Sequence, residues 1–258
     1  LWAGAEGEVD CWTGGGDMLP IVRQLAAVKP HQPRLVVEFN VGSATAWGDE
    51  SPKPIRPEVI EQRLAQILAA GGQFNIQPFH GGTNFGFWGG RLPEADAAYP
   101  ITSRDMGAPL SEVGTTGASY QAVRRICTFA SRFSRLFAHL EPEFRPVVPC
   151  PVTEDSESEG PRHSRTQSRN SEARSYPTVV HCSGTQGGVA FIFRGQTAPV
   201  GKFRLLLPHG GDMVVDAGDS PVSWCLFDTY LGGRAKLDYC GLSAWGTVGR
   251  VLVVFGIG

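Results

Sequence analysis

The first half of the chain alternates short apolar runs with stretches in which apolar residues recur at helical spacing. Asp17 is a candidate N-cap for a helix that ends near Val28, and Pro57 suits the first turn of a second helix that Gly71 ends. Three apolar runs predict strands, at residues 8–12, 35–38 and 74–79. Strand, helix, strand, helix, strand at this spacing predicts βαβ units with a parallel sheet.

The second half has a different pattern. A longer helix is predicted over residues 119–140, and after Pro177 short apolar runs separated by Gly, Pro and Asp predict an antiparallel sandwich or small barrel. Between them, an acidic tract and a Ser/Arg-rich tract have no periodic apolar positions, which predicts a disordered linker. A short RNA-binding tail is the alternative, but the neighbouring acids favour a solvated linker. The predicted domains are residues 1–144, the linker 145–177, and a β domain 178–258 truncated at its C-terminal end.

Composition and charge narrow the classes of partner and site that this protein could have. The chain has 258 residues, 41% hydrophobic and 19% charged, with a formal net charge of −2. This charge favours neither nucleic acid nor an anionic membrane as a partner, and no apolar run approaches the roughly 20 residues of a membrane helix. The six cysteines are scattered without a CxxC pair, a pattern of neither a zinc site nor an obvious disulfide framework. No metal or other cofactor is predicted, and the oligomeric state and compartment stay open.

The two ends of the chain suggest a piece of a longer protein. The chain begins at Leu1 without Met and without a signal peptide, and it ends in the apolar run 251–255, which resembles a strand inside a domain. We therefore expect a fragment. A fragment with no stable fold of its own is a further alternative, because an incomplete barrel exposes open sheet edges.

Glu38 is the first candidate for chemistry. It follows the apolar residues 35–37, where the predicted strand should end, and Gly42 and Trp47 lie in the loop beyond it. A carboxylate at the C-terminal end of a buried parallel strand is the usual placement of a catalytic residue in an α/β barrel. The alternative is a solvated residue at a strand end, and this stretch alone leaves both open.

A glycine-rich run at residues 80–90 is the second candidate. Its glycines allow close approach of the backbone to a ligand, its aromatic residues offer apolar faces, and Thr83 and Asn84 offer hydrogen bonds. This combination suits a sugar pocket. A phosphate-binding loop is excluded because no Lys follows the glycines. A tight turn packed by its own aromatic side chains remains the alternative.

Three segments resemble glycoside hydrolase family 35, the β-galactosidase family. Residues 74–90 resemble its FHGGTNFGF signature, residues 35–48 resemble its nucleophile strand with the following Trp-Gly, and residues 101–114 resemble its TSYDYDAPLSEAG segment. They occur in the family's order and at its spacing. The resemblance covers residues 1 to about 140 and, more weakly, the β region after Pro177.

The resemblance implies a partial (β/α)8 TIM barrel, its last strands, followed by an antiparallel β-sandwich-like domain. It also implies a retaining glycosidase acting on terminal β-galactose, which needs two carboxylates roughly 5–5.5 Å apart. Glu38 matches the nucleophile on the seventh barrel strand. The family's acid/base, in an Asn-Glu pair on the fourth strand, has no counterpart upstream of Glu38, so the chain alone is expected to be inactive. By the same resemblance the sugar contacts are Trp47, Asn75, Gln77, His80, Gly81, Gly82, Thr83, Asn84 and Met106.

The chain departs from the family at several of these positions. Gln77 and Met106 stand where the family has tyrosines that contact the sugar, and Arg104 replaces another aromatic residue. The aromatic platform for the sugar is weakened, which leaves galactose specificity open. A carbohydrate-binding or degenerate, non-catalytic remnant is therefore an alternative to the enzyme. Glu112 matches a family position but is expected to fix a loop.

Overall fold

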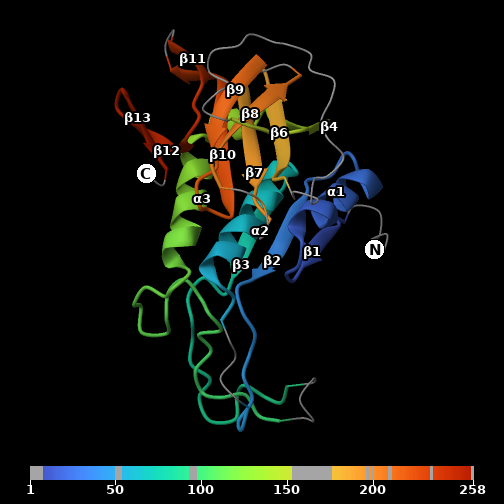
Figure 1. The fold of residues 1–258 in the computed structure, drawn as a ribbon. Helices are drawn as coiled ribbons and strands as arrows, with labels where there is room; N and C mark the ends of the chain where they lie inside the picture. The colour runs from blue at the N-terminus through green and yellow to red at the C-terminus, as the bar shows by residue number, and fades with distance from the viewer. Residues whose placement is uncertain are drawn as a thin grey trace, which may run out of the picture. The chain divides into compact units, whose positions relative to one another are not determined.

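The structure is a computed structural model that describes residues 8–49, 54–92, 98–152, 176–195, 198, 200–208, 211–232 and 235–256. The chain divides into two compact units, Leu1–Cys127 and Thr128–Gly258, whose elements are labelled in Figure 1. None of the helices described is both long enough and apolar enough to cross a membrane.

The first unit contains a three-stranded parallel sheet in the order β1-β2-β3. Two helices connect the strands along the chain, as the apolar periodicity predicts, and Figure 1 shows them beside the sheet. The elements are β1 (Cys11–Thr13), α1 (Met18–Val28), β2 (Leu35–Asn40), α2 (Pro57–Ala69) and β3 (Gln73–Gln77). The predicted βαβ order is therefore confirmed. Three parallel strands do not make a barrel, and the partial barrel stays a prediction.

Local sequence signals explain the ends of the two helices. Asp17 occupies the N-cap position of α1, as predicted, but its side chain makes no capping hydrogen bond. Pro57 lies in the first turn of α2. Gly71, with φ of +70°, follows the last turn of that helix, and its N–H donates to the Leu68 carbonyl. A left-handed residue just beyond a helix is typically glycine, because other residues meet a Cβ penalty there.

The two faces of this sheet differ in burial. Val36 and Phe39 of β2 are fully buried, as are apolar residues of α1 and α2 such as Val22 and Leu64. On the other face Val37 is 39% exposed, and alternate residues of β3, including Asn75, are exposed. Parallel sheets normally have both faces covered. Here helices cover one face, and the described residues of this unit leave polar side chains on the other.

The second unit consists mostly of antiparallel strands. Its largest sheet has the order β11-β10-β7-β6-β4, a second sheet has the order β5-β8-β9, and β12 pairs with β13. The strand bounds are β4 (Glu141–Val147), β5 (Cys150–Pro151), β6 (Thr178–Gly184), β7 (Gly187–Phe193), β8 (Lys202–Leu207), β9 (Gly211–Asp216), β10 (Val222–Gly232), β11 (Ala235–Tyr239), β12 (Ser243–Val248) and β13 (Val251–Phe255). The β-rich character predicted after Pro177 is confirmed.

One apolar core joins the two larger sheets of this unit. The cluster of buried residues includes Ile192 and Phe227 from the five-stranded sheet and Phe203, Leu205 and Met213 from the three-stranded sheet. Alternating burial along β8 directs every second side chain into this core. Side chains of two sheets that share one core are the arrangement of a sandwich, which is consistent with the predicted sandwich-like domain.

The predicted long helix is divided in two. The structure has α3 (Tyr120–Arg132) and α4 (Ser134–Phe137), separated at Phe133. Within the second unit, Phe129 stacks on Trp224 with ring centroids 5.5 Å apart, and Phe137 meets Phe129 edge-on. These rings bury the predicted apolar stripe of the helix.

The compact units divide within α3, between Cys127 and Thr128. The sequence analysis places domain boundaries at residues 144 and 177 instead, and those boundaries stay predictions. Residues 145–147 and 150–151, inside the predicted linker, belong to β4 and β5. The rest of that linker, residues 153–175, lies outside the described residues.

Candidate functional site

Glu38 lies in an irregular part of β2. The step from Val36 to Phe39 takes three residues on β2 but only two on β3, from Phe74 to Ile76. The pairing with β1 also shifts register at this point, where Thr13 is opposite Glu38. Such a bulge re-aims a side chain and is frequent beside active sites. Glu38 is partly exposed, and its backbone carbonyl accepts a 2.8 Å hydrogen bond from the Gly14 N–H.

The neighbouring strand β3 presents polar side chains beside Glu38. Asn75 and Gln77 alternate with half-buried Phe74 and Ile76 and are exposed. The Asn75 side chain donates a 3.0 Å hydrogen bond to the Val37 carbonyl, one residue before Glu38. Gln77 pairs in register with Asn40 near the end of β2. Three of the predicted site residues therefore lie on two adjacent strands, in the carboxyl halves that lead to the loops where such sites form.

The glycine-rich run is held by a segment about 20 residues further along the chain. The Gly81 N–H donates to the Leu110 carbonyl at 2.8 Å, and the Asn84 N–H donates to the Thr102 carbonyl at 2.7 Å. In the reverse direction, the Arg104 N–H donates to the Gly82 carbonyl at 2.7 Å. Residues 80–90 and 101–114, from two of the three segments that resemble family 35, are thus joined by backbone hydrogen bonds. We call these two stretches the loop pair.

Two carboxylates fix this loop pair. The Asp105 carboxylate accepts a 2.5 Å hydrogen bond from the Glu112 N–H, and the Thr83 hydroxyl donates to Glu112 Oε2 at 2.9 Å. Gly81 lies so close to this junction that a Cβ there would collide with Asp105 Oδ1 and approach the Glu112 nitrogen to 2.9 Å. The expectation that Glu112 fixes a loop is confirmed by these contacts.

This geometry predicts opposite tolerances for two adjacent glycines. Gly81→Ala should force Asp105 off Glu112 and lower the free energy of unfolding by about 1–3 kcal/mol, the usual cost of overpacking. Gly82→Ala is the matched control, because a Cβ there would have no heavy atom within 4 Å. Urea unfolding of both variants of the 258-residue chain measures the difference. Equal stability of the two variants would contradict the loop contacts described here.

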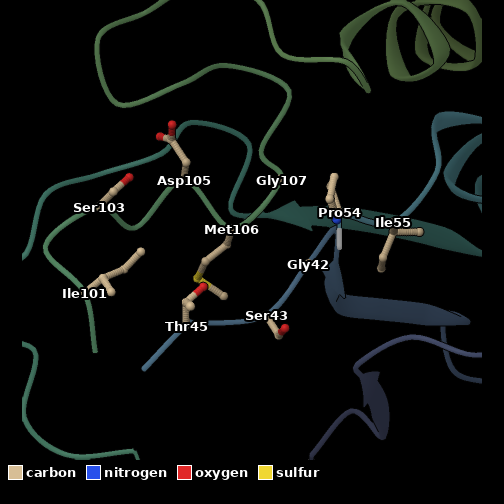
Figure 2. A pocket seen from close by; sticks show the side chains of 10 residues that line it. All are labelled: Gly42, Ser43, Thr45, Pro54, Ile55, Ile101, Ser103, Asp105, Met106 and Gly107. Carbon is tan, nitrogen blue, oxygen red and sulfur yellow. The ribbon is translucent and has the colours of Figure 1, made fainter. Parts of the chain in front are cut away.

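A cavity of about 330 Å³ lies where residues 42–45 approach residues 101–107. Figure 2 shows the side chains around it, with the Met106 side chain next to Thr45 and the Asp105 carboxylate pointing away. Gly42 packs so tightly on the Met106 carbonyl oxygen that a Cβ would collide with it, and Met106 has a φ of +47°. The residues that line the cavity are Gly42, Ser43, Thr45, Pro54, Ile55, Ile101, Ser103, Asp105, Met106 and Gly107.

The predicted site residues are distributed over four places. Glu38, Asn75 and Gln77 lie on strands, whereas Met106 lines the cavity of Figure 2. Trp47 and Asn84 line a smaller hollow of about 150 Å³, together with Phe87 and Tyr99. The remaining predicted contacts, at residues 80–83, lie in the loop pair. No single cavity described here brings all of them together.

Sequence reasoning left Ser43, Thr45 and Ser103 out of the set of contacts, although they line the cavity. Their hydroxyls carry no distinctive motif, so only the approach of the two loops reveals them. The self-packed turn, the alternative for residues 80–90, is not what the structure has. Phe85, Phe87 and Trp88 are 73%, 80% and 92% exposed, and Phe87 meets Tyr99 edge-on at 5.3 Å.

Other ionisable groups of this unit have local partners. The Asp49 side chain accepts a hydrogen bond from the Ala46 N–H at 3.2 Å, and Asp10 lies 3.7 Å from the Lys29 ammonium group. Burial raises the pKa of the Cys127 thiol to about 11, so this cysteine is protonated at neutral pH and is a poor nucleophile. Within the described residues, no three His, Cys, Asp or Glu side chains are placed to hold a metal ion.

Comparison with known families identifies the first unit. Residues 8–130 match the family model of glycosyl hydrolases family 35. This match supports membership of family 35 for that part of the chain. The matched region begins before β1 and extends into α3, so every predicted site residue lies within it.

Individual relatives agree with this family 35 assignment. The chain is 40% identical over 98 residues to the human "Beta-galactosidase", covering 38% of this chain and 14% of that protein. It is 37% identical over 103 residues to the mouse "Beta-galactosidase-1-like protein", covering 40% of this chain and 16% of that protein. It is 34% identical over 108 residues to "Beta-galactosidase 1" of Dictyostelium discoideum, covering 41% and 16%. The chain thus spans only about one sixth of the length of the curated relatives it matches.

Proposed function

We propose that this chain carries the nucleophile part of a retaining glycosidase of β-galactosidase type. The observation that carries the proposal is the position of Glu38 in the β2 bulge, two residues before the carboxyl end of that parallel strand at Asn40, within a region that matches the family 35 model. Bulges re-aim side chains next to active sites, and strand ends of α/β barrels hold catalytic groups. The exposed Asn75 and Gln77 on β3 are positioned to bind sugar hydroxyls beside it.

In the proposed reaction the ionised Glu38 carboxylate attacks the anomeric carbon of a terminal β-galactose residue. The carbon–oxygen bond to the leaving group breaks, and an acid protonates the departing oxygen. A glycosyl ester on Glu38 results. Water, deprotonated by the same acid/base group, then attacks the anomeric carbon, releasing galactose with retained configuration and restoring the Glu38 carboxylate.

The acid/base group in this proposal comes from a segment outside the 258 residues. Among the described carboxylates of the first unit, Asp105 and Glu112 hold the loop pair, and Asp49 holds its own loop. Retention requires a second carboxylate roughly 5–5.5 Å from the nucleophile with freedom to exchange a proton. Carboxylates whose oxygens already accept these hydrogen bonds are poorly placed for that role.

The substrate class is proposed from the relatives, which are named β-galactosidases. The sugar contacts proposed for this chain are Asn75, Gln77 and the residues of the loop pair, with Met106 and its cavity next to them. Gln77 and Met106 offer an amide and a thioether where the family resemblance places tyrosines. We therefore expect galactose to be bound with fewer aromatic contacts than in the relatives.

The test is hydrolysis of a chromogenic β-galactoside by the complete gene product and, separately, by the 258-residue chain. We expect activity in the complete protein and none in the chain alone, because the acid/base is supplied from elsewhere. Activity of the chain alone would overturn that placement of the acid/base. Absence of activity in both, with retained galactose binding, would instead support a non-catalytic carbohydrate-binding protein.

A further inference from the structure

The second unit has a basic pocket that the glycosidase proposal does not use. It has a volume of about 540 Å³ and lies between the end of α3, α4, the β6–β7 turn and the end of β10. This volume falls within the roughly 300–1,000 Å³ typical of small-molecule sites. Residues Arg132, Ser134, Arg135, Gln186, Tyr230 and Thr247 contribute the polar and aromatic groups of its lining.

Two guanidinium groups give this pocket its charge. Arg132 and Arg135 are exposed and line the pocket, and no Asp or Glu is among the lining residues. Within the part of the chain that the structure describes, neither guanidinium pairs with a carboxylate. By contrast Lys236, near the pocket, is neutralised by Asp228 at 2.5 Å. The two exposed arginines therefore present guanidinium groups without a described carboxylate partner, in the fork geometry that binds carboxylate, sulfate or phosphate groups.

Packing fixes the Arg132 stem and the turn that carries both arginines. Gly246 of β12 leaves room for the Arg132 stem, since a Cβ there would lie only 2.8 Å from Arg132 Cγ. Phe133 and Leu136, between and after the two arginines, are 7% and 4% exposed and anchor this turn in the core. Side chains whose neighbours are locked lose less entropy when a ligand binds, which favours a preformed site.

The wall formed by Tyr230 and Gln186 supplies contacts of a different kind. Tyr230 is 50% exposed, its ring carries the Lys236 ammonium group 5.6 Å from the centroid, and its N–H donates to the Gln186 carbonyl at 3.2 Å. A half-exposed aromatic ring beside neutral amide and hydroxyl groups suits a sugar ring with its hydroxyls. A bare inorganic anion would use only the arginines and leave this wall unoccupied.

We propose that this pocket binds an acidic sugar, one that carries a carboxylate or sulfate group, with the anion on Arg132 and Arg135 and the ring against Tyr230. The site lies in a different unit from Glu38 and does not rest on the glycosidase chemistry. It would give the protein a second, non-catalytic contact with anionic glycans.

The test measures binding of a short galacturonic acid oligomer, neutral galactose and inorganic sulfate to the 258-residue chain by calorimetry. We expect the oligomer to bind more tightly than either of the other two. Arg132→Gln and Arg135→Gln should each weaken oligomer binding about tenfold, the scale of one lost charged hydrogen bond. Arg250→Gln is the matched control, because Arg250 is an exposed arginine of the same unit that does not line the pocket.

A fourth variant separates the sugar from a bare anion. Tyr230→Leu should weaken binding of the oligomer and leave binding of inorganic sulfate unchanged. Circular dichroism of each variant establishes whether it is folded. If the Arg132→Gln variant is unfolded, the Arg135→Gln variant provides the test, because Arg135 is exposed. The proposal is overturned if the arginine variants bind the oligomer as the unmodified chain does. It is also overturned if inorganic sulfate binds as tightly as the oligomer, which would indicate an adventitious ion only.

Discussion

Glu38→Gln should reduce hydrolysis of a chromogenic β-galactoside by the complete gene product by about four orders of magnitude or more, the scale expected when a covalent nucleophile is removed. The amide has nearly the shape of the carboxylate but cannot form the glycosyl ester. Galactose binding should therefore persist, because Asn75 and Gln77 are unaffected. Steady-state kinetics together with calorimetry of galactose binding would separate the two effects.

The matched control for this experiment is Glu58→Gln. Glu58 is an exposed residue in the first turn of α2, in the same unit as Glu38. This variant makes the same chemical change and should leave turnover within about twofold, as exposed substitutions usually do. If Glu38→Gln retained the turnover of the Glu58 control, Glu38 would be a strand-end residue without a catalytic role.

Arg125→Met should destabilise the first unit by about 2–4 kcal/mol, because it leaves the Glu61 carboxylate buried without its partner. Arg125 Nε and one terminal nitrogen each donate a 2.7 Å hydrogen bond to the two Glu61 oxygens. Glu61 is 3% exposed and Arg125 is 39% exposed, so solvent at the arginine keeps the expected loss below that of a fully buried pair. The hydrogen bond to Glu61 raises the Arg125 pKa, and the arginine therefore stays charged at every accessible pH.

Urea unfolding of the 258-residue chain measures this loss. Arg124→Met is the control on the same helix, since Arg124 is exposed, and it should change stability by no more than about 0.5 kcal/mol. A double variant, Glu61→Leu with Arg125→Leu, should recover most of the loss because it removes the buried Glu61 charge together with its partner. Equal stability of the Arg125 and Arg124 variants would show that the ion pair contributes nothing to the fold.

Secondary structure was predicted poorly from the sequence where local signals were weak. β4 contains Pro142 and Pro146 with several charged residues, a composition that indicates a loop, yet it pairs with β6 at the edge of the large sheet. Proline is compatible with an edge strand because one side of the strand needs no ladder hydrogen bonds. The break between α3 and α4 is likewise invisible in the continuous apolar stripe of residues 119–140.

The sequence alone determined the order of elements in the first unit, the β-rich character of the second, and the family 35 resemblance. These follow from apolar periodicity and from motifs whose residues are close in the chain, which reflect local conformation and burial. It also predicted a strand that ends at Glu38, whereas β2 continues to Asn40.

Only the tertiary structure decided how the site is built. The bulge at Glu38 depends on its register with β1 and β3, and the loop pair depends on Gly81 meeting Asp105 across 24 positions. The cavity at Met106 and the basic pocket at Arg132 each join segments that are far apart in the chain. Such features depend on backbone register and side-chain contacts between distant segments, which no local pattern of hydrophobic and polar residues specifies.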